Sequence, residues 1–188
     1  MKNRFFYLLA IIISLPLGCS TDVTDKEKSM QSVTSSKQVI DFLDDLFIEK
    51  LEESPEYMTY LGMRERYGEW DDNSDEAADR RLLMTRDHLK RVMAIDLTNI
   101  NDSAKLSVRM FIEQATNLIE ADRWRYHNYP VSQMRGVHGR IPSFMINQHL
   151  IANEQEAKAY VKRLMGVPKV LERLVSHLEI RTDTNIIA

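Results

Sequence analysis

The sequence predicts an all-α protein built from antiparallel helical hairpins, with five or six helices. Only 6 glycines and 5 prolines occur among 188 residues, which is few for a β protein full of tight turns. Apolar residues recur at the i, i+3, i+4, i+7 spacing of amphipathic helices along most of the chain, and no strand-like alternation extends over four residues. A content of 44% hydrophobic and 28% charged residues is typical of a folded globular chain.

The N-terminus predicts a lipoprotein signal peptide over residues 1–18. Lys2 and Arg4 form a basic start, and residues 5–17 form an almost uninterrupted apolar run. A helix needs about 20 apolar residues to cross a bilayer, so this run is too short to span one. It fits the apolar core of a secretory signal instead.

Cys19 is the predicted lipidation site. Gly18 precedes it directly, and this pair resembles the bacterial lipobox, in which the thiol receives a diacylglycerol and the chain is cut before the cysteine. Pro16 stands where that pattern usually has leucine. Because Ser20 rather than an aspartate follows the cysteine, we expect an outer-membrane lipoprotein of a bacterial cell envelope. The alternative is an ordinary signal peptide followed by an accidental cysteine.

Residues 19–37 are rich in Ser, Thr, Asp and Lys and lack periodicity, so we expect a flexible membrane tether. Residues 38–188 form the predicted helical region. The net charge of −3 argues against a nucleic-acid partner, which would require a clustered basic face. A single cysteine excludes an internal disulfide and a cysteine-built metal site.

The first two predicted helices lie on either side of a Ser-Pro pair. Apolar spacing predicts a helix over residues 39–51, with Ser35 or Ser36 as the cap of its N-terminus. This helix ends near Pro55, because the residue before a proline disfavours the helical region. Pro55 then begins a short helix over residues 56–61, which a glycine closes.

Two longer helices follow. Asn73 and Glu76 have the spacing of a capping box, and the helix after them ends around Asp96. Residues 101–103 begin the next helix, whose apolar face extends to Trp124.

Residues 126–142 predict one long irregular loop. Pro130, Gly136, Gly139 and Pro142 interrupt the helical rhythm there.

Asn153 and Glu156 form a second capping-box match, which starts the last predicted helix. Gly166 and Pro168 are expected to break or kink this helix. Residues 181–188 show no periodicity.

A search for catalytic and metal-binding patterns gives none. Zinc hydrolases often place two histidines at i and i+4 with a glutamate beside the first. Here no histidine is followed by glutamate, and the closest two are eleven residues apart. Ser132 and Ser143 lack the Gly-x-Ser-x-Gly context of a hydrolase nucleophile. We therefore predict no catalytic residue and no metal ligand in this chain.

The irregular loop provides the candidate ligand-binding residues, because loops carry function more often than helices do. Its polar and aromatic side chains are the predicted lining of a cleft: Tyr126, Tyr129, Gln133, Arg135, His138 and Arg140. The alternative is a packed connection whose polar groups only satisfy backbone hydrogen bonds.

Three stretches, in this order and spacing, resemble the N-terminal part of the DUF885 family of bacterial proteins. They are residues 54–62, residues 129–142 and residues 156–178, and the resemblance covers roughly residues 39–179.

The resemblance implies a large, all-helical protein related to zinc metallopeptidases, with a His-Glu zinc motif far downstream of these stretches. Nothing in this sequence matches that motif, so no zinc ligand carries over. The implied function is a lipid-anchored N-terminal region of a hydrolase, an incomplete domain that is inactive alone and binds a peptide substrate only with its C-terminal part. The alternative is a stand-alone, lipid-anchored binding or scaffold module.

Overall fold

The computed structural model describes residues 35–186 and confirms the all-α fold. The predicted signal peptide, Cys19 and nearly all of the tether lie outside the described residues. Within residues 35–186, none of the helices is both long and apolar enough to cross a membrane. The helices are α2 (Ser36–Leu51), α3 (Pro55–Tyr60), α4 (Asp75–Met93), α5 (Asp102–Ala121), a 3-10 turn (Asp122–Trp124), α6 (Val137–Asn147) and α7 (Glu154–Asp183).

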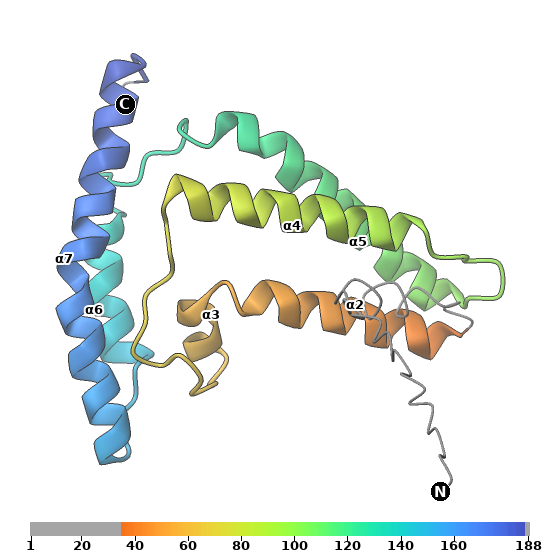
Figure 1. Cartoon of the computed structure of the whole chain (residues 1–188), viewed down its shortest axis with the longest axis horizontal. Coiled ribbons are helices and arrows are strands. Elements are labelled where there is room, and N and C mark those ends of the chain that lie inside the picture. The colour runs from red at the N-terminus through yellow and green to blue at the C-terminus, as the bar shows by residue number, and fades with distance from the viewer. Residues whose placement is uncertain (1–34, 187–188) are drawn as a thin grey trace, which may run out of the picture. The chain divides into compact units, whose positions relative to one another are not determined.

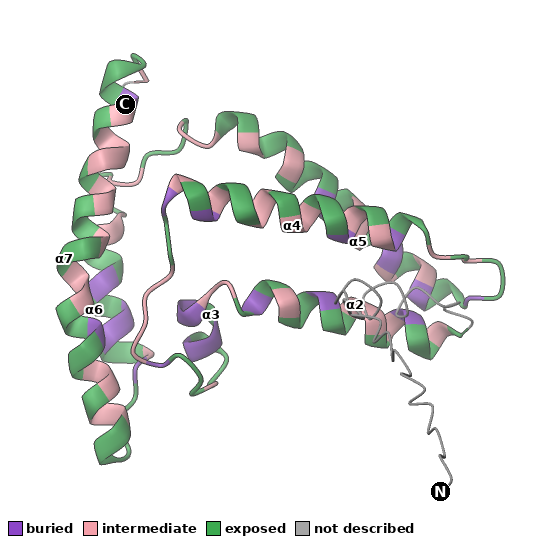
Figure 2. Ribbon diagram, in the orientation of Figure 1, coloured by how far each residue is buried: buried purple, intermediate pink, exposed green. Residues whose placement is uncertain are grey.

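Helices α2, α4 and α5 pack against one another and alternate in direction along the chain (Figure 1). Their shared core consists of apolar side chains that are at most 5% exposed. These are Val39, Leu46, Val92, Ile100, Ala104 and Val108. Figure 2 shows further buried segments in α3 and α6. The amphipathic spacing in the sequence therefore predicts the core that α2, α4 and α5 share.

Side-chain caps fix the helix starts as the sequence predicts, with one correction. Ser35, Asn101 and Asn153 each accept a hydrogen bond from the amide three residues on. The cap of α4 is Ser74 and not Asn73: Ser74 Oγ accepts from the Ala77 amide at 3.2 Å.

Gly62 closes α3, as predicted, with a φ of 85°, a left-handed conformation that glycine adopts without the steric penalty of a side chain.

The predicted loop over residues 126–142 is too long. Only its first part, up to Gly136, is irregular, because α6 already begins at Val137. Gly139 and Pro142 lie inside α6, so neither of them ends the helix. Helix α6 then packs against α7.

The last helix also differs from the prediction. Helix α7 is continuous from Glu154 to Asp183, so Gly166 and Pro168 do not interrupt it and the tail is helical beyond residue 181. Pro168 and Leu164, the residue whose carbonyl loses its amide partner, both lie on the exposed side of the helix.

Candidate functional site

A cleft of about 650 Å³ lies between α7 and the N-terminal end of α4. The connector before α4 and the segment before α6 complete its walls. Trp70 comes from the connector, Tyr126 and Pro130 from the segment before α6, and Val170 and Leu174 from α7. The cleft is thus built by three regions of the chain that are far apart in sequence, residues 68–81, 125–140 and 162–177.

One wall of the cleft is cationic. Lys169, Arg173 and His177 follow one another at intervals of four residues on α7, so all three lie on the same face of the helix. We call these three side chains the cation row, in which Lys169 and Arg173 carry the positive charge. The side chains of Lys169 and Arg173 make no hydrogen bond or ion pair within residues 35–186. His177 Nε2 is buried without a hydrogen bond, 3.8 Å from Asp75 Oδ1.

Hydrogen bonds at the start of α4 hold a second wall of the cleft, next to His177. Tyr126 donates its hydroxyl to Asp75 Oδ1 across 2.6 Å. This hydrogen bond is the main reason why the pKa of Tyr126 is raised above its usual value. Arg125, the preceding residue, forms ion pairs with Asp79 and Asp122 at 2.8 and 2.6 Å. These contacts attach the segment before α6 to α4.

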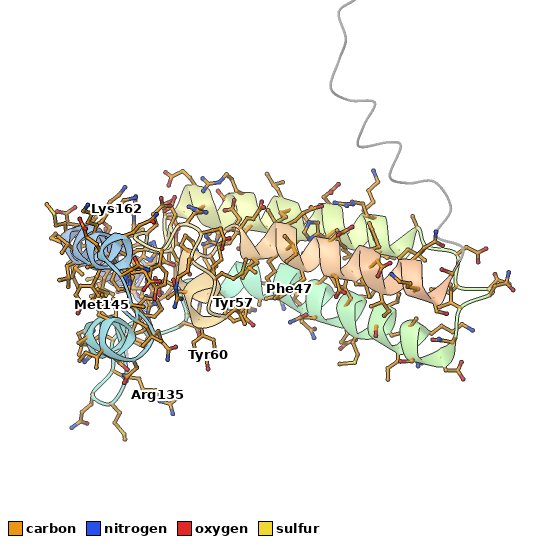
Figure 3. The ribbon with its side chains drawn as sticks, turned by 90° about the horizontal axis from the view of Figure 1, so that it is seen from below. Phe47, Tyr57, Tyr60, Arg135, Met145 and Lys162 are labelled. Carbon is orange, nitrogen blue, oxygen red and sulfur yellow. The ribbon has the colours of Figure 1, made fainter. Side chains whose placement is uncertain are left out.

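The structure brings only two of the six predicted cleft-lining residues into this cleft. Tyr126 and Arg140 line it. Tyr129 instead donates to the backbone oxygen of Ile186, at 3.2 Å. Gln133, Arg135 and His138 are exposed outside the lining, and Figure 3 shows Arg135 on the protruding loop before α6.

Behind the cleft, the side chain of Arg163 on α7 is completely buried. Its Nε and Nη2 donate to the Glu69 carbonyl at 3.0 and 2.6 Å. Nη2 also donates to Thr59 Oγ1 at 3.1 Å, and Nη1 donates to His149 Nδ1 at 3.0 Å. Three aromatic rings surround the guanidinium, with centroids 4.9 to 5.6 Å from Cζ. These rings belong to Tyr67, Trp70 and Phe144.

The Arg163 cluster, meaning Arg163 with these hydrogen-bond and ring partners, positions the cleft wall. Trp70 lines the cleft, and its indole N–H donates to the Arg163 carbonyl at 2.7 Å. Glu69 also lines the cleft, and its carbonyl accepts two bonds from the guanidinium. The connector is therefore fixed to α7 by hydrogen bonds of both kinds, since Trp70 donates to Arg163 and Glu69 accepts from it.

Hydrogen bonding and burial define the charge state of the cluster. His149 Nδ1 accepts from Arg163, and its Nε2 lies 3.3 Å from the Glu156 carbonyl, so the ring fits the neutral form with its proton on Nε2. Burial, assisted by the positive charge of Arg163, lowers the pKa of His149 below its usual value. Burial also lowers the pKa of Arg163, but the ordinary value of arginine is so high that the group stays charged at neutral pH.

Glu56 connects α3 to α6 at the edge of the cleft. It is only 6% exposed and pairs with Arg140, a lining residue. Glu56 Oε1 also accepts from the Asp71 amide at 3.3 Å, while the Glu56 amide donates to Asp71 Oδ1 at 2.8 Å. Burial raises the pKa of Glu56 although Arg140 acts in the opposite direction. Arg140 is thus held by the fold and is not a free cation in the cleft.

The cation row and the Arg163 cluster were not predicted from the sequence. A four-residue spacing of Lys169, Arg173 and His177 was visible, but the predicted break at Pro168 separated this stretch from the start of α7. Nothing in the sequence distinguished Arg163 from an exposed arginine, because its partners are up to 104 residues away along the chain.

Residues 35–186 contain no group of three His, Cys, Asp or Glu side chains that could hold a metal ion. The zinc implied by the resemblance therefore does not fit the described residues.

The fold and site define an all-helical protein with a cleft that is cationic on one wall. A comparison of the sequence with protein families gives a match over residues 55–188 to DUF885, described as bacterial proteins of unknown function. The chain belongs to the DUF885 family. No curated protein and no solved structure matches it.

Proposed function

We propose that residues 35–186 form the substrate-binding helical region of a larger, hydrolase-like DUF885 protein anchored at the bacterial outer membrane through Cys19. The observation that carries this proposal is the cleft, whose shape is fixed by buried hydrogen bonds while Lys169 and Arg173 have no partner among the described residues. A prebuilt concave site with a few convergent polar groups is the usual form of a small-molecule site.

In this proposal the described region contributes binding, and the reacting groups come from elsewhere in the protein. The zinc that the resemblance implies would be held outside residues 35–186, and no step of hydrolysis is assigned to the described side chains. We also propose that the substrate of the whole protein is a peptide.

An uncovered apolar stripe on α7 supports the larger assembly. Val161, Leu164, Leu171 and Val175 are between 39% and 54% exposed. With Pro168 they alternate at spacings of three and four residues, the pattern of a helix face that packs against another helix. Contiguous exposed apolar patches of this kind mark surfaces that other protein covers.

The lipid anchor rests on the sequence of residues 1–20. A single acyl chain binds a membrane only marginally, whereas a multiply acylated N-terminal cysteine stays attached. The anchor would keep the cleft in the envelope, where peptides outside the cytoplasm are the accessible substrates.

The test uses the native product. An antibody against this chain should detect, in the membranes of the cells that encode it, a protein much larger than 21.9 kDa. That product should hydrolyse peptides, and a zinc chelator should abolish the hydrolysis. A Val170→Trp change, which fills the cleft, should raise KM severalfold, whereas Met110→Trp on exposed α5 should leave KM unchanged.

A native product of 21.9 kDa or less without peptide hydrolysis would overturn the proposal. If that small product bound a defined protein partner, the result would favour the alternative function, a stand-alone binding or scaffold module.

A further inference from the structure

The cation row has a surplus of positive charge that the fold does not use. Six cationic side chains line the cleft besides His177, namely Arg81, Arg125, Arg140, Lys162, Lys169 and Arg173. The first four have internal partners: Arg81 donates to the Asp72 carbonyl, and Arg125, Arg140 and Lys162 form ion pairs. Lys169 and Arg173 have none within residues 35–186.

Among residues 35–186, none of the four carboxylates of the lining forms an ion pair with Lys169 or Arg173, and each accepts hydrogen bonds from other donors. Glu69 pairs with Arg66 and Lys162. Asp71 accepts from Ser54 and the Glu56 amide, Asp72 from the Ser74 amide, and Asp75 from Tyr126.

Lys169 and Arg173 can reach one ligand group together. Residues four apart on a helix have Cβ atoms about 6 Å apart and lie one above the other on the same face. An arginine presents a planar fork that matches a carboxylate or phosphate bidentately, and a lysine adds a point charge with three donors. His177 lies one further turn along the same wall.

Apolar side chains accompany the cations. Val170 and Leu174 follow Lys169 and Arg173 along α7. Pro130, from the segment before α6, and Val137, the first residue of α6, also line the cleft. A ligand that binds here therefore meets charge and an apolar surface together. An inorganic anion would contact only the charged side chains and not the apolar surface.

We propose that the cleft binds an organic oxyanion, a carboxylate or phosphate group attached to an apolar body, with the oxyanion on Lys169 and Arg173. The apolar body lies against Val170 and Leu174. This inference gives the ligand chemistry of the cleft and rests on the proposed function for the use of that cleft. It does not depend on hydrolysis.

The test measures direct binding to the full chain, purified in a non-ionic detergent. The probes are N-acetylphenylalanine, its amide and phenyl phosphate, which share a phenyl group and differ in the anion. Titration calorimetry gives each affinity, and the ring resonances of His177 report whether the ligand occupies this cleft. We expect the amide to bind about tenfold or more weakly than the carboxylate, because it lacks a charge-assisted hydrogen bond.

Lys169→Ala and Arg173→Ala should each weaken carboxylate binding about threefold to tenfold. The matched controls are Lys158→Ala, on an exposed part of the same helix, and Arg109→Ala, on exposed α5. Both controls leave the lining intact and should leave the affinity unchanged. All four positions are on the surface of helices, so thermal unfolding should confirm that each variant is folded.

The possible results separate this inference from the proposed function. Equal binding of the amide and the carboxylate would overturn the oxyanion inference while leaving a cleft that binds a ligand. Tighter binding of phenyl phosphate would support the inference and identify phosphate as the preferred source of the oxyanion. Equal losses in Arg109→Ala and Arg173→Ala would overturn it, because net charge and not the cleft would then determine the affinity. Absence of binding by all three probes would overturn this inference, whereas the size of the native product and its hydrolysis of peptides decide the proposed function separately.

Discussion

Arg163 Nη1 donates to His149 Nδ1 across 3.0 Å, and this buried contact joins a side chain of α7 to the segment that precedes it. The guanidinium has no carboxylate partner within salt-bridge distance among the described residues. Neutral acceptors and aromatic rings stabilise its charge instead. An unpaired buried charge is costly, so every one of these acceptors matters for the stability of the cleft wall.

Replacing Arg163 by alanine should destabilise the fold strongly. The change leaves the Glu69 carbonyl and His149 Nδ1 without a donor and creates a cavity between three aromatic rings. We expect the free energy of unfolding to fall by about 2–4 kcal/mol. Urea denaturation, followed by tryptophan fluorescence and by circular dichroism, measures it.

The matched control is Arg109→Ala on the exposed face of α5, which should change the free energy of unfolding by less than about 0.5 kcal/mol. Arg163→Met keeps part of the apolar stem and should lie between the two. A loss as small as the control in Arg163→Ala would show that the cluster does not hold α7 to the connector.

His149 should make stability depend on pH just below neutrality. Burial lowers its pKa in the folded state, whereas the unfolded chain keeps a value of about 6.5. The unfolded state then binds more protons below about pH 6.5, so the stability present above that pH is lost as pH falls toward the folded-state pKa. The slope should approach at most about 1.4 kcal/mol per pH unit.

Denaturation curves from about pH 8 to pH 5 test this dependence. His149→Asn should be less stable at every pH but should show a shallower slope, because asparagine does not titrate. An unchanged slope in His149→Asn would assign the pH dependence to another group.

Two glycines in helices should respond to alanine with opposite signs. A Cβ at Gly166 would lie 2.9 Å from Trp70 Cδ1, whereas a Cβ at Gly139 meets nothing within 4 Å. Alanine favours a helix interior over glycine by about 0.5–1 kcal/mol. Overpacking costs about 1–3 kcal/mol and should outweigh that gain only at Gly166.

Thermal unfolding therefore should show Gly139→Ala stabilised and Gly166→Ala destabilised. Displacement of the Trp70 indole should also shift its fluorescence in Gly166→Ala, a change that Gly139→Ala should lack. Stabilisation of both variants would mean that Trp70 can move aside without cost.

Local signals made the helices predictable from the sequence. Ser35, Asn101 and Asn153 cap helices where the sequence indicated, because a cap depends on residues within one turn. The errors in the predicted helix boundaries came from residues that can either end a helix or lie within one. Pro142 and Pro168 were each expected to interrupt a helix, but the first lies within α6 and the second within α7.

The cleft was only partly predictable, because contacts between distant segments define it. Tyr126 and Arg140 were identified from their polar loop, yet their partners Asp75 and Glu56 lie 51 and 84 residues away. Burial of Arg163 depends on contacts across nearly a hundred residues, which no local pattern encodes.

Cys19 should carry the lipid anchor. Cells that express the chain and receive labelled palmitate should incorporate the label into the wild-type protein, and Cys19→Ala should incorporate none. Ser20→Ala is the matched control, since it changes the neighbouring residue without removing the thiol. Label that persists in Cys19→Ala would exclude lipidation at this residue.

Glu156 should contribute to resistance against acid. Its Oε2 accepts from the Ala152 amide at 2.6 Å, and its Oε1 accepts from Arg64 Nε at 3.0 Å. The hydrogen bond from the Ala152 amide is the main reason that the pKa of Glu156 is lowered, and Arg64 acts in the same direction. Because the folded-state value is lowered, its stabilisation is present above the usual glutamate pKa of about 4.3 and is lost as pH falls through the folded-state pKa.

Glu156→Gln keeps an amide acceptor but removes the titration, so the acid unfolding transition should become less steep and begin at a higher pH. Circular dichroism between about pH 6 and pH 2 measures the transition. Glu154→Gln, an exposed glutamate two residues earlier that pairs with Lys158, is the matched control and should leave the midpoint unchanged. Equal shifts in the two variants would mean that net charge, and not the bond to the Ala152 amide, determines the acid response.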